Sequence, residues 1–217
     1  KTPACVPAIV NAGIKKVVIG IKDLNSRVKG KGIQALKKNG IKVLVGVLEN
    51  ECRQINQAYE HWIQTKTPFV LMKIGMSANG MIWSKSLNGQ WITGKESRQK
   101  VFELRNSLDA NLVSIRTVQQ DNPRLTARIK HGRNPVRVVL DADLEISLRT
   151  RMLKEKGSTW IFCSKKANKQ KQKLLETKFN CTIIRVPAKG KYVHLKTVLK
   201  ELGKRHIGSV LVEGGKE

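Results

Sequence analysis

The stretch that decides the fold runs from Pro68 to Gly80 and reads Pro-Phe-Val-Leu-Met-Lys-Ile-Gly-Met-Ser-Ala-Asn-Gly. An apolar run of this length, followed by glycine, predicts a buried β-strand that ends in a turn. Working outward, residues 95–107 predict a helix. The segment 117–128 (Thr-Val-Gln-Gln-Asp-Asn-Pro-Arg-Leu-Thr-Ala-Arg) predicts an arginine-bearing loop. This order of strand, glycine turn, basic helix and loop suits a pocket for two phosphate-bearing ligands.

Strand-like and helix-like segments alternate along the whole chain. Strands are expected at 16–21, 41–47, 69–75, 110–115, 136–140, 158–163, 181–186 and 207–212, and helices at 6–12, 32–39, 49–65, 95–107 and 195–204, with a Lys-rich helix between the strands at 158–163 and 181–186. This alternation favours an α/β fold with a parallel or mostly parallel sheet. Thr67-Pro68 interrupts the pattern, so we place a domain boundary there, with domains at residues 1–66 and 67–217.

The first of these domains has two features that bear on its packing. Its first strand-like run, Lys16 to Ile21, is β-branched and predicts a buried strand. In the helix expected at 49–65, Ile55, Tyr59 and Ile63 lie at helical spacing and predict an amphipathic helix.

Composition bounds the class of protein. The chain has 217 residues and 40% hydrophobic residues, enough for a real core, and no run approaches the roughly 18 apolar residues of a membrane helix. No secretory signal is visible at its start. The chain begins at Lys1 without an initiator Met and ends directly after a strand-like run, so we expect a fragment truncated at both ends. The four cysteines lie far apart, which favours reduced thiols in a cytoplasmic protein: Cys5, Cys52, Cys163 and Cys181.

The charge is strongly positive. There are 42 basic and 16 acidic residues, for a net charge of +26. Such a charge is typical of nucleic-acid binding, but it also fits a lysine-rich enzyme with anionic ligands. Only Lys165 to Lys173 is densely basic, and aromatic residues make up 5% of the chain. We therefore favour the enzyme and disfavour nucleic acid as a partner.

Several residues could carry chemistry. Arg105 and Arg128 could pair with phosphate oxygens, although a helical arginine such as Arg105 could equally point into water. Asp121 is either part of a structural turn or an acceptor for ribose hydroxyls. Trp91 is either a packing residue or a cover for a nicotinamide or pyrimidine ring. The segment Glu213-Gly214-Gly215 follows the last expected strand, where the backbone N–H groups of glycines could approach a pyrophosphate.

A zinc site is weakly indicated. Cys5 precedes a short helix and could be a zinc ligand, but a single cysteine cannot hold the metal. No histidine or second cysteine lies at ligand spacing from it. The usual alternative is a free buried thiol.

Together these motifs resemble the bifunctional riboflavin-biosynthesis deaminase/reductase family. Residues 1 to about 65 are similar to the last part of its cytidine-deaminase-like αβα domain, through Thr2-Pro3-Ala4-Cys5, Asp23-Leu24-Asn25 and Val28-Lys29-Gly30-Lys31-Gly32. Residues 68–217 are similar to its dihydrofolate-reductase-like α/β domain. The matching segments are Lys73 with Ser77 and Gly80, Trp91-Ile92-Thr93, Leu104-Arg105, the whole of 117–128, and Val212-Glu213-Gly214-Gly215. Three positions depart from the family pattern: Asn79, Gly89 and Ala142.

The resemblance implies roles for individual residues. It places NADPH against Gly75, Trp91, Thr117, Asp121, Gly214 and Gly215. It places a phosphorylated pyrimidine substrate against Arg105, Leu125, Arg128 and Glu213. It makes Cys5 one ligand of a zinc site whose other ligands would lie before Lys1.

The activity implied is NADPH-dependent reduction of the ribosyl chain of 5-amino-6-(5-phosphoribosylamino)uracil to ribityl, with zinc-dependent deamination in the full-length parent. The alternatives are a reductase-only enzyme with a relic deaminase domain and, less favoured, a basic nucleic-acid-binding module. The oligomeric state stays open, with a homo-oligomer compatible with the family.

Overall fold

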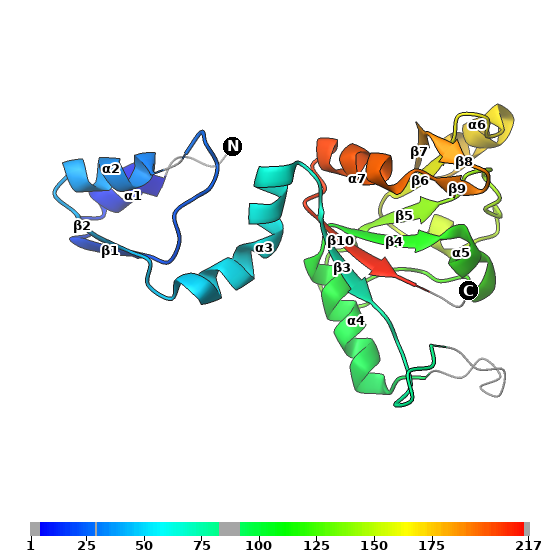
Figure 1. Cartoon of the computed structure of the whole chain (residues 1–217), viewed down its shortest axis with the longest axis horizontal. Coiled ribbons are helices and arrows are strands. Elements are labelled where there is room, and N and C mark those ends of the chain that lie inside the picture. The colour runs from blue at the N-terminus through cyan, green and yellow to red at the C-terminus, as the bar shows by residue number, and fades with distance from the viewer. Residues whose placement is uncertain (1–4, 29, 83–91, 215–217) are drawn as a thin grey trace. The chain divides into compact units, whose positions relative to one another are not determined.

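The computed structural model describes residues 5–28, 30–82 and 92–214 (Figure 1). By its internal contacts the chain divides into two compact units, Lys1–Lys66 and Thr67–Glu217. The described strands form a two-stranded sheet, a six-stranded sheet and a two-stranded hairpin. Among the described residues, no helix combines the length and apolar character that a membrane crossing requires.

The first unit contains three helices and a small parallel sheet. Its elements, in chain order, are α1 (Cys5–Asn11), β1 (Lys16–Ile19), α2 (Lys31–Lys38), β2 (Lys42–Val45) and α3 (Glu49–Thr65). Lys16 of β1 pairs with Lys42 of β2, and Ile19 pairs with Val45. Glycines in the left-handed region follow α1 and α2: φ is 68° at Gly13 and 72° at Gly40.

The core of this unit is thin. Of its described residues, only Leu36 and Ile41 are buried. The prediction of a buried strand at 16–21 is wrong, because Val18 in β1 is 54% exposed. The helix α3 forms over the predicted residues, but Ile55 on its apolar side is 84% exposed. Two strands and three short helices offer too little surface within the unit to cover these side chains.

The second unit is built on a six-stranded parallel sheet in the order β3-β10-β4-β5-β6-β7. Its strands are β3 (Phe69–Lys73), β4 (Ala110–Ser114), β5 (Val136–Leu140), β6 (Thr159–Ser164), β7 (Cys181–Val186) and β10 (Ser209–Glu213). Its helices are α4 (Lys95–Ser107), α5 (Ile115–Asp121), η2 (Arg151–Lys154), α6 (Lys169–Lys178) and α7 (Leu195–Lys204). The antiparallel pair β8 (Ala188–Lys189) and β9 (Tyr192–Val193) forms a short hairpin. The expected α/β fold with a parallel sheet is therefore confirmed.

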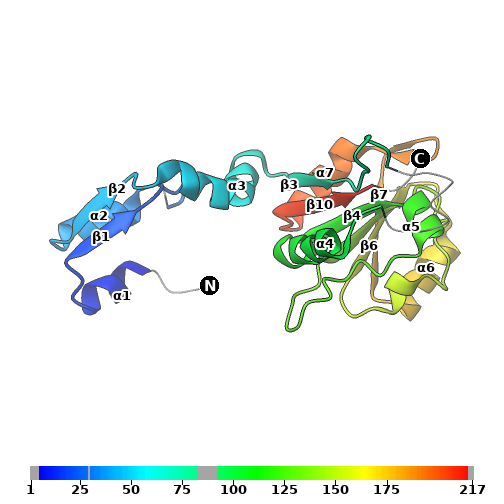
Figure 2. The ribbon, with the colours of Figure 1, turned by 90° about the horizontal axis from the view of Figure 1, so that it is seen from below.

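The central strands of this sheet are covered on both faces, because successive residues of each strand point to opposite sides. The prediction of a buried strand after Pro68 is wrong for one face of the edge strand β3, where Val70 is 42% and Met72 66% exposed. Leu112 and Val138 pack with Val198 and Leu202 of α7 on one side. The next residues along, Val113 and Val139, pack with Val118 of α5 and Leu175 of α6 on the other. Figure 2 shows α4 and α7 on opposite faces of the sheet.

The sequence analysis did not predict helix α5. We expected a strand at 110–115 followed by a loop and turn, whereas α5 occupies Ile115–Asp121. Ser114 caps this helix, since its hydroxyl accepts the Thr117 N–H, and Asn122 ends it in the left-handed region with φ 41°. Ile115, Thr117 and Val118 are β-branched and favour a strand, so the local sequence did not predict a helix here. Burial of Val118 against the sheet outweighs that local preference.

Strand β5 carries a buried arginine in its interior. Arg137 is 1% exposed, and its guanidinium donates to Thr159 Oγ1 at 2.9 Å and to the carbonyls of Lys156 at 3.0 Å and Gly157 at 2.6 Å. Burial lowers the pKa of Arg137. These bonds tie the turn before β6 to the sheet and satisfy the buried charge.

Candidate active site at the carboxyl edge of the sheet

A buried carboxylate lies where the last strand ends. Glu213, the final residue of β10, is 8% exposed. Its two oxygens accept from Arg105 at 2.6 and 2.9 Å, and Asn111 Nδ2 donates to Oε1 at 2.6 Å. Lys73 Nζ, at the end of the neighbouring strand β3, is 3.2 Å from Oε2. One carboxylate therefore gathers residues from β3, β4 and α4.

The charges around Glu213 keep it ionised. Burial by itself raises the pKa of this carboxyl. The hydrogen bond and charge of Arg105, with help from Lys73 and Asn111, outweigh burial and hold the pKa below its ordinary value. An ionised carboxylate at a strand end can accept hydrogen bonds from a polar ligand.

Arg105 does not point into water. It is 8% exposed, and besides Glu213 its guanidinium donates to the Thr126 carbonyl at 3.2 Å. It therefore links α4, β10 and the 122–131 loop. Its side chain is occupied largely in holding Glu213, which sequence reasoning did not foresee.

The loop that follows α5 holds Arg128 beside this pair. The Arg128 guanidinium carbon is 5.1 Å from the centre of the Phe102 ring, and that of Arg105 is 5.8 Å from the same ring. Burial, followed by the charges of Arg105 and Arg124, lowers the pKa of Arg128. The structure thus brings Arg105, Arg128 and Glu213 together, although they are far apart in sequence.

Unusual backbone geometry fixes this loop. Asn122, Leu125, Arg128 and His131 all have positive φ, between 41° and 59°. Such residues are costly unless their surroundings hold them, and they gather at functional sites. Leu125 is 2% exposed and packs into the core on the α5 side, so only its backbone is available to a ligand.

Two asparagine side chains tie the loop to neighbouring segments. Asn134 Oδ1 accepts the Ala127 N–H at 3.0 Å, and Asn122 Oδ1 accepts the Arg151 N–H at 2.9 Å.

The described cofactor candidates lie along the same edge of the sheet. Gly75 follows β3, Gly214 follows β10, and Thr117 and Asp121 lie on α5 after β4. Burial raises the pKa of Asp121, and the charge of Lys73 opposes that rise, which places Asp121 within the field of the Glu213 cluster. Trp91, Gly215 and the departing position Gly89 lie outside the described residues.

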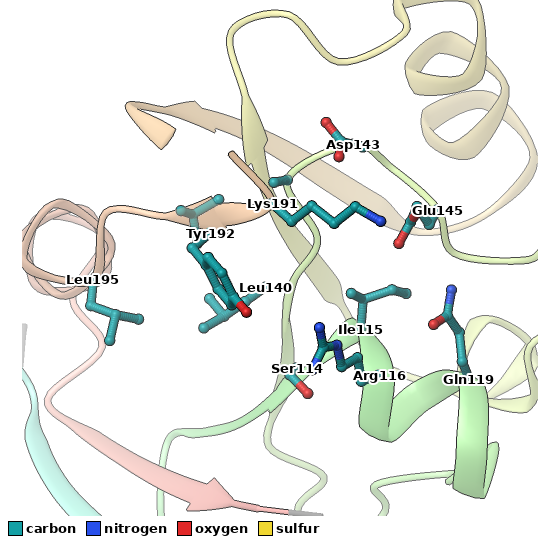
Figure 3. Close-up of a pocket in the computed structure, with 12 residues that line it drawn as sticks. Ser114, Ile115, Arg116, Gln119, Leu140, Asp143, Glu145, Lys191, Tyr192 and Leu195 are labelled. Atoms are coloured by element: carbon teal, nitrogen blue, oxygen red, sulfur yellow. The ribbon is translucent and has the colours of Figure 1, made fainter. Parts of the chain in front are cut away.

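A pocket lies at the same edge of the sheet, where β4 and β5 end. Its cavity volume is about 440 Å³, and its walls come from β4, α5, the end of β5 with the segment after it, and the residues around β9 (Figure 3). The lining residues are Ser114, Ile115, Arg116, Gln119, Leu140, Ala142, Asp143, Glu145, Lys191, Tyr192, Val193 and Leu195. Of these, sequence reasoning had singled out only Ala142.

A sequence profile of the RibD C-terminal domain matches residues 68–217. The chain belongs to the RibD family. Its curated relatives include the riboflavin biosynthesis proteins RibD of Actinobacillus pleuropneumoniae, 36% identical over 99% of this chain and 57% of that protein, and of Aquifex aeolicus, 36% identical over 99% and 59%. The chain therefore spans just under three fifths of the length of these relatives.

A solved structure agrees. The diaminohydroxyphosphoribosylaminopyrimidine deaminase/5-amino-6-(5-phosphoribosylamino)uracil reductase of Thermotoga maritima superposes with a TM-score of 0.83 and 35% identity, over 99% of this chain and 58% of that one. The resemblance of residues 68–217 to the RibD reductase domain is thus confirmed. The deaminase-like interpretation of residues 1–66 stays a prediction.

Two residues of the Glu213 cluster were missed as site residues. Lys73 was matched to the family pattern without a role, and its place at the end of a strand was the available signal. Asn111 had no signal, because asparagine within a strand-like run is uninformative until the strand order is known. Nearby, the Ser77 hydroxyl donates to Asn79 Oδ1 at 2.5 Å, so the departing asparagine takes part in a local turn.

The zinc prediction concerns Cys5 alone. Cys5 begins α1 and is an exposed free thiol. Within the described ranges, no group of three or more histidine, cysteine, aspartate or glutamate side chains is placed to hold a metal ion. Zinc binding therefore stays a prediction for a longer protein.

Proposed function

We propose that this chain carries the reductase activity of riboflavin biosynthesis, the NADPH-dependent reduction of the ribosyl chain of 5-amino-6-(5-phosphoribosylamino)uracil to ribityl. The observation that supports it most directly is the buried Glu213 carboxylate held by Arg105, Asn111 and Lys73 beside Arg128. It lies at the carboxyl edge of a parallel sheet, where α/β proteins bind their ligands. Family membership and the titles of the relatives point to the same reaction.

The residues present fit a nicotinamide dinucleotide. The pocket beside α5 has room for a nucleotide and combines apolar side chains with two cations, Arg116 and Lys191, and two carboxylates, Asp143 and Glu145. Thr117 and Asp121 lie on α5, other residues of which line the pocket, and Gly75 and Gly214 follow β3 and β10. When bound, the cofactor would supply the hydride that reduces C1′ of the opened sugar.

Different polar side chains bind different parts of the substrate. Arg128, which is exposed, pairs with the 5′-phosphate. Glu213 accepts hydrogen bonds from N–H or O–H groups of the substrate near the nicotinamide. Arg105 holds Glu213 in its ionised form and adds positive charge for the phosphate, and the charge of Lys73 acts on both Glu213 and Asp121.

The remaining expectations for the family belong to the longer protein. We propose that residues 1–66 form the last part of a zinc-dependent pyrimidine deaminase domain, with Cys5 as one zinc ligand, and that residues 67–217 form the reductase domain. The division of the chain at Lys66 and Thr67 supports this arrangement. A reductase-only enzyme with a relic deaminase is the alternative, and the sequence preceding Lys1 distinguishes the two. The net charge of +26 alone does not support nucleic-acid binding as a second function.

The test is oxidation of NADPH, followed at 340 nm, with the deaminated pyrimidine ribosyl-phosphate as substrate and the full-length protein as enzyme. Substrate-dependent oxidation, with a ribityl product identified by mass spectrometry, supports the proposal. NADPH oxidation that is independent of this substrate, or none in a protein that binds both ligands, contradicts it.

A further inference from the structure

We infer that Asn111 is a positioning residue of the reductase site: its side-chain amide commits Oε1 of Glu213 to the protein, so that the substrate meets Oε2. This inference rests on the proposed function, because it assumes that Glu213 contacts the substrate. It deepens that function by naming the oxygen that meets the substrate and the residue that decides it. Neither motif nor resemblance indicated Asn111.

Asn111 is a fully buried polar residue in a central strand of the sheet. Its exposed fraction is 0%, and its strand β4 lies between β10 and β5. It pairs in register with Leu211 of β10, which is also 0% exposed. Val113, two residues along the same face of β4, is 1% exposed. In such apolar surroundings the amide of Asn111 needs a partner to offset the cost of its burial.

Glu213 satisfies only half of this amide. Glu213 lies two residues beyond Leu211 on the same face of β10, and Asn111 Nδ2 donates to its Oε1 at 2.6 Å. The other half, Asn111 Oδ1, is buried and has no hydrogen-bond partner among the described residues. A half-satisfied amide is a poor way to stabilise a core, and residues that break the rules of core packing are expected at functional sites.

The contacts to Glu213 are not equivalent. An ionised carboxylate has about four lone-pair sites, two on each oxygen. Oε1 accepts from Arg105 Nε and from Asn111 Nδ2, both at 2.6 Å. Oε2 accepts from Arg105 Nη2 at 2.9 Å and lies 3.2 Å from Lys73 Nζ. The Lys73 side chain is 28% exposed and that of Arg105 is 10% exposed. Oε1 is thus filled by two short bonds from buried donors, and Oε2 has the longest contact, with the most exposed donor.

A donor on the substrate therefore reaches Glu213 by replacing Lys73 at Oε2. This contact is the easiest to replace, because it is the longest and involves the most solvated donor. Arg105 alone would hold the carboxylate through two parallel bonds, but it would leave a second lone-pair site on Oε1 open. Asn111 closes that site, so the carboxylate keeps one orientation toward the substrate.

The first test is steady-state reduction of the deaminated pyrimidine ribosyl-phosphate by the full-length protein, comparing wild type with Asn111→Leu. Leucine is close to asparagine in size and removes both the donor and the unpartnered acceptor, so the variant should keep a thermal midpoint near that of wild type. We expect kcat/KM to fall by about 10-fold or more, because a hydrogen bond to a charged group is lost. An unchanged kcat/KM overturns the inference.

The matched control is Ser164→Ala in β6. Ser164 Oγ is the other buried side-chain atom that has no hydrogen-bond partner in the described part of the chain. Its removal should leave kcat/KM at the wild-type value. Equal losses in Ser164→Ala and Asn111→Leu would show that the effect comes from disturbing the core, which also overturns the inference.

A double-mutant cycle separates a positioning role from a purely structural one. If Asn111 acts through Glu213, Asn111→Leu should change kcat/KM by less than about 3-fold in the Glu213→Gln background. A purely structural role gives the same fold loss in both backgrounds and contradicts the inference.

NMR of the ¹⁵N-labelled wild-type protein tests the two oxygens without any variant. One side-chain amide proton of Asn111 should resonate downfield because it is bonded to the carboxylate, and saturating substrate should leave it there. Loss of this downfield shift on addition of substrate would mean that the substrate takes Oε1, and the assignment of the oxygens would be wrong.

The proposed function fails by a different result. A wild type that binds the substrate and NADPH but does not reduce the substrate contradicts the proposed function, and the NMR measurement still shows which oxygen the substrate meets. If the wild type reduces the substrate and Asn111→Leu matches it, the reductase survives and only the role of Asn111 is lost.

Discussion

The two units of this chain use similar elements with opposite results. In residues 67–217, a six-stranded parallel sheet whose central strands are covered on both faces buries two arginines and a glutamate, Arg105, Arg137 and Glu213, each with several hydrogen bonds. In the described residues up to Lys66, two parallel strands and three helices bury only Leu36 and Ile41. A buried charged site needs a large apolar scaffold around it, because the scaffold must offset the cost of removing charges from water.

The largest effect is expected from breaking the charged cluster. Glu213→Gln leaves Arg105 buried without its partner charge, and loss of one partner of a buried ion pair costs about 3–5 kcal/mol. We expect a comparable fall in the free energy of unfolding, measured in urea, and a fall of at least ~100-fold in kcat/KM for reduction.

Glu176→Gln is the matched control, since Glu176 is exposed on α6 and accepts from Gln172 at 3.0 Å. It should behave as wild type. Equal behaviour of the two variants would show that Glu213 is not held as described.

A pair of apolar truncations tests the difference in packing directly. Phe162 in β6 is 0% exposed, so Phe162→Ala should cost about 3–5 kcal/mol in unfolding free energy. Ile55→Ala in α3, at an exposed position, should cost less than about 0.5 kcal/mol. Urea unfolding of both variants gives the comparison. A large cost for Ile55→Ala would mean that its side chain is covered in the folded protein.

Arg128 tests the loop that completes the site. Arg128→Ala removes the exposed guanidinium proposed to bind the 5′-phosphate. We expect KM for the substrate to rise by at least ~10-fold with little change in stability, because one charge-assisted pair is lost. Steady-state kinetics with varied substrate measures it. An unchanged KM removes Arg128 from the site, and Arg149→Ala, at another exposed arginine, is the control.

The charged cluster also predicts a dependence of stability on pH. The folded-state pKa of Glu213 lies below its ordinary value of roughly 4.3, because Arg105, Lys73 and Asn111 outweigh burial. Its contribution to stability is therefore full above about pH 5 and is lost as pH falls through the folded-state pKa. The stability gap between wild type and Glu213→Gln should narrow over that range. A gap that is constant from pH 7 to pH 3 would contradict the pKa shift.

The smallest effect is a difference in thiol reactivity. Cys5 in the first unit is exposed, whereas Cys163 in the second is buried. Burial also raises the pKa of Cys181 to about 11. At pH 8, iodoacetamide should label Cys5 well before Cys163 and Cys181, which mass spectrometry of peptides can follow. Simultaneous labelling would mean that Cys163 and Cys181 are as accessible in the folded protein as Cys5.

Much of the secondary structure could be predicted because it depends on local pattern. The helices at 49–65 and 95–107 and the strand at 136–140 form over the predicted residues. Periodicity, proline and glycine act within a few residues of one another. The helix α5 was missed because its β-branched residues favour a strand until the sheet is present to bury Val118.

The candidate site was likewise predictable only in part. Arginines in a helix and a loop and a glutamate at a strand end were recognisable as candidates. Their partners were not, because each contact joins residues separated by many positions: Arg105 and Glu213 are 108 residues apart, and Asn111 and Glu213 are 102 apart. The pocket likewise combines α5 with residues after β8, which no local pattern relates.

The sequence by itself determined the alternation of strands and helices, the family, and the chemical types available at the strand ends. Only the tertiary structure decided that Arg105 turns inward to Glu213, that Arg128 shares the Phe102 ring with it, and that Arg116 lines a pocket. The physical reason is that strand order and burial are set by packing between distant segments. Whether a charged side chain meets water, a carboxylate or a ligand depends on that packing.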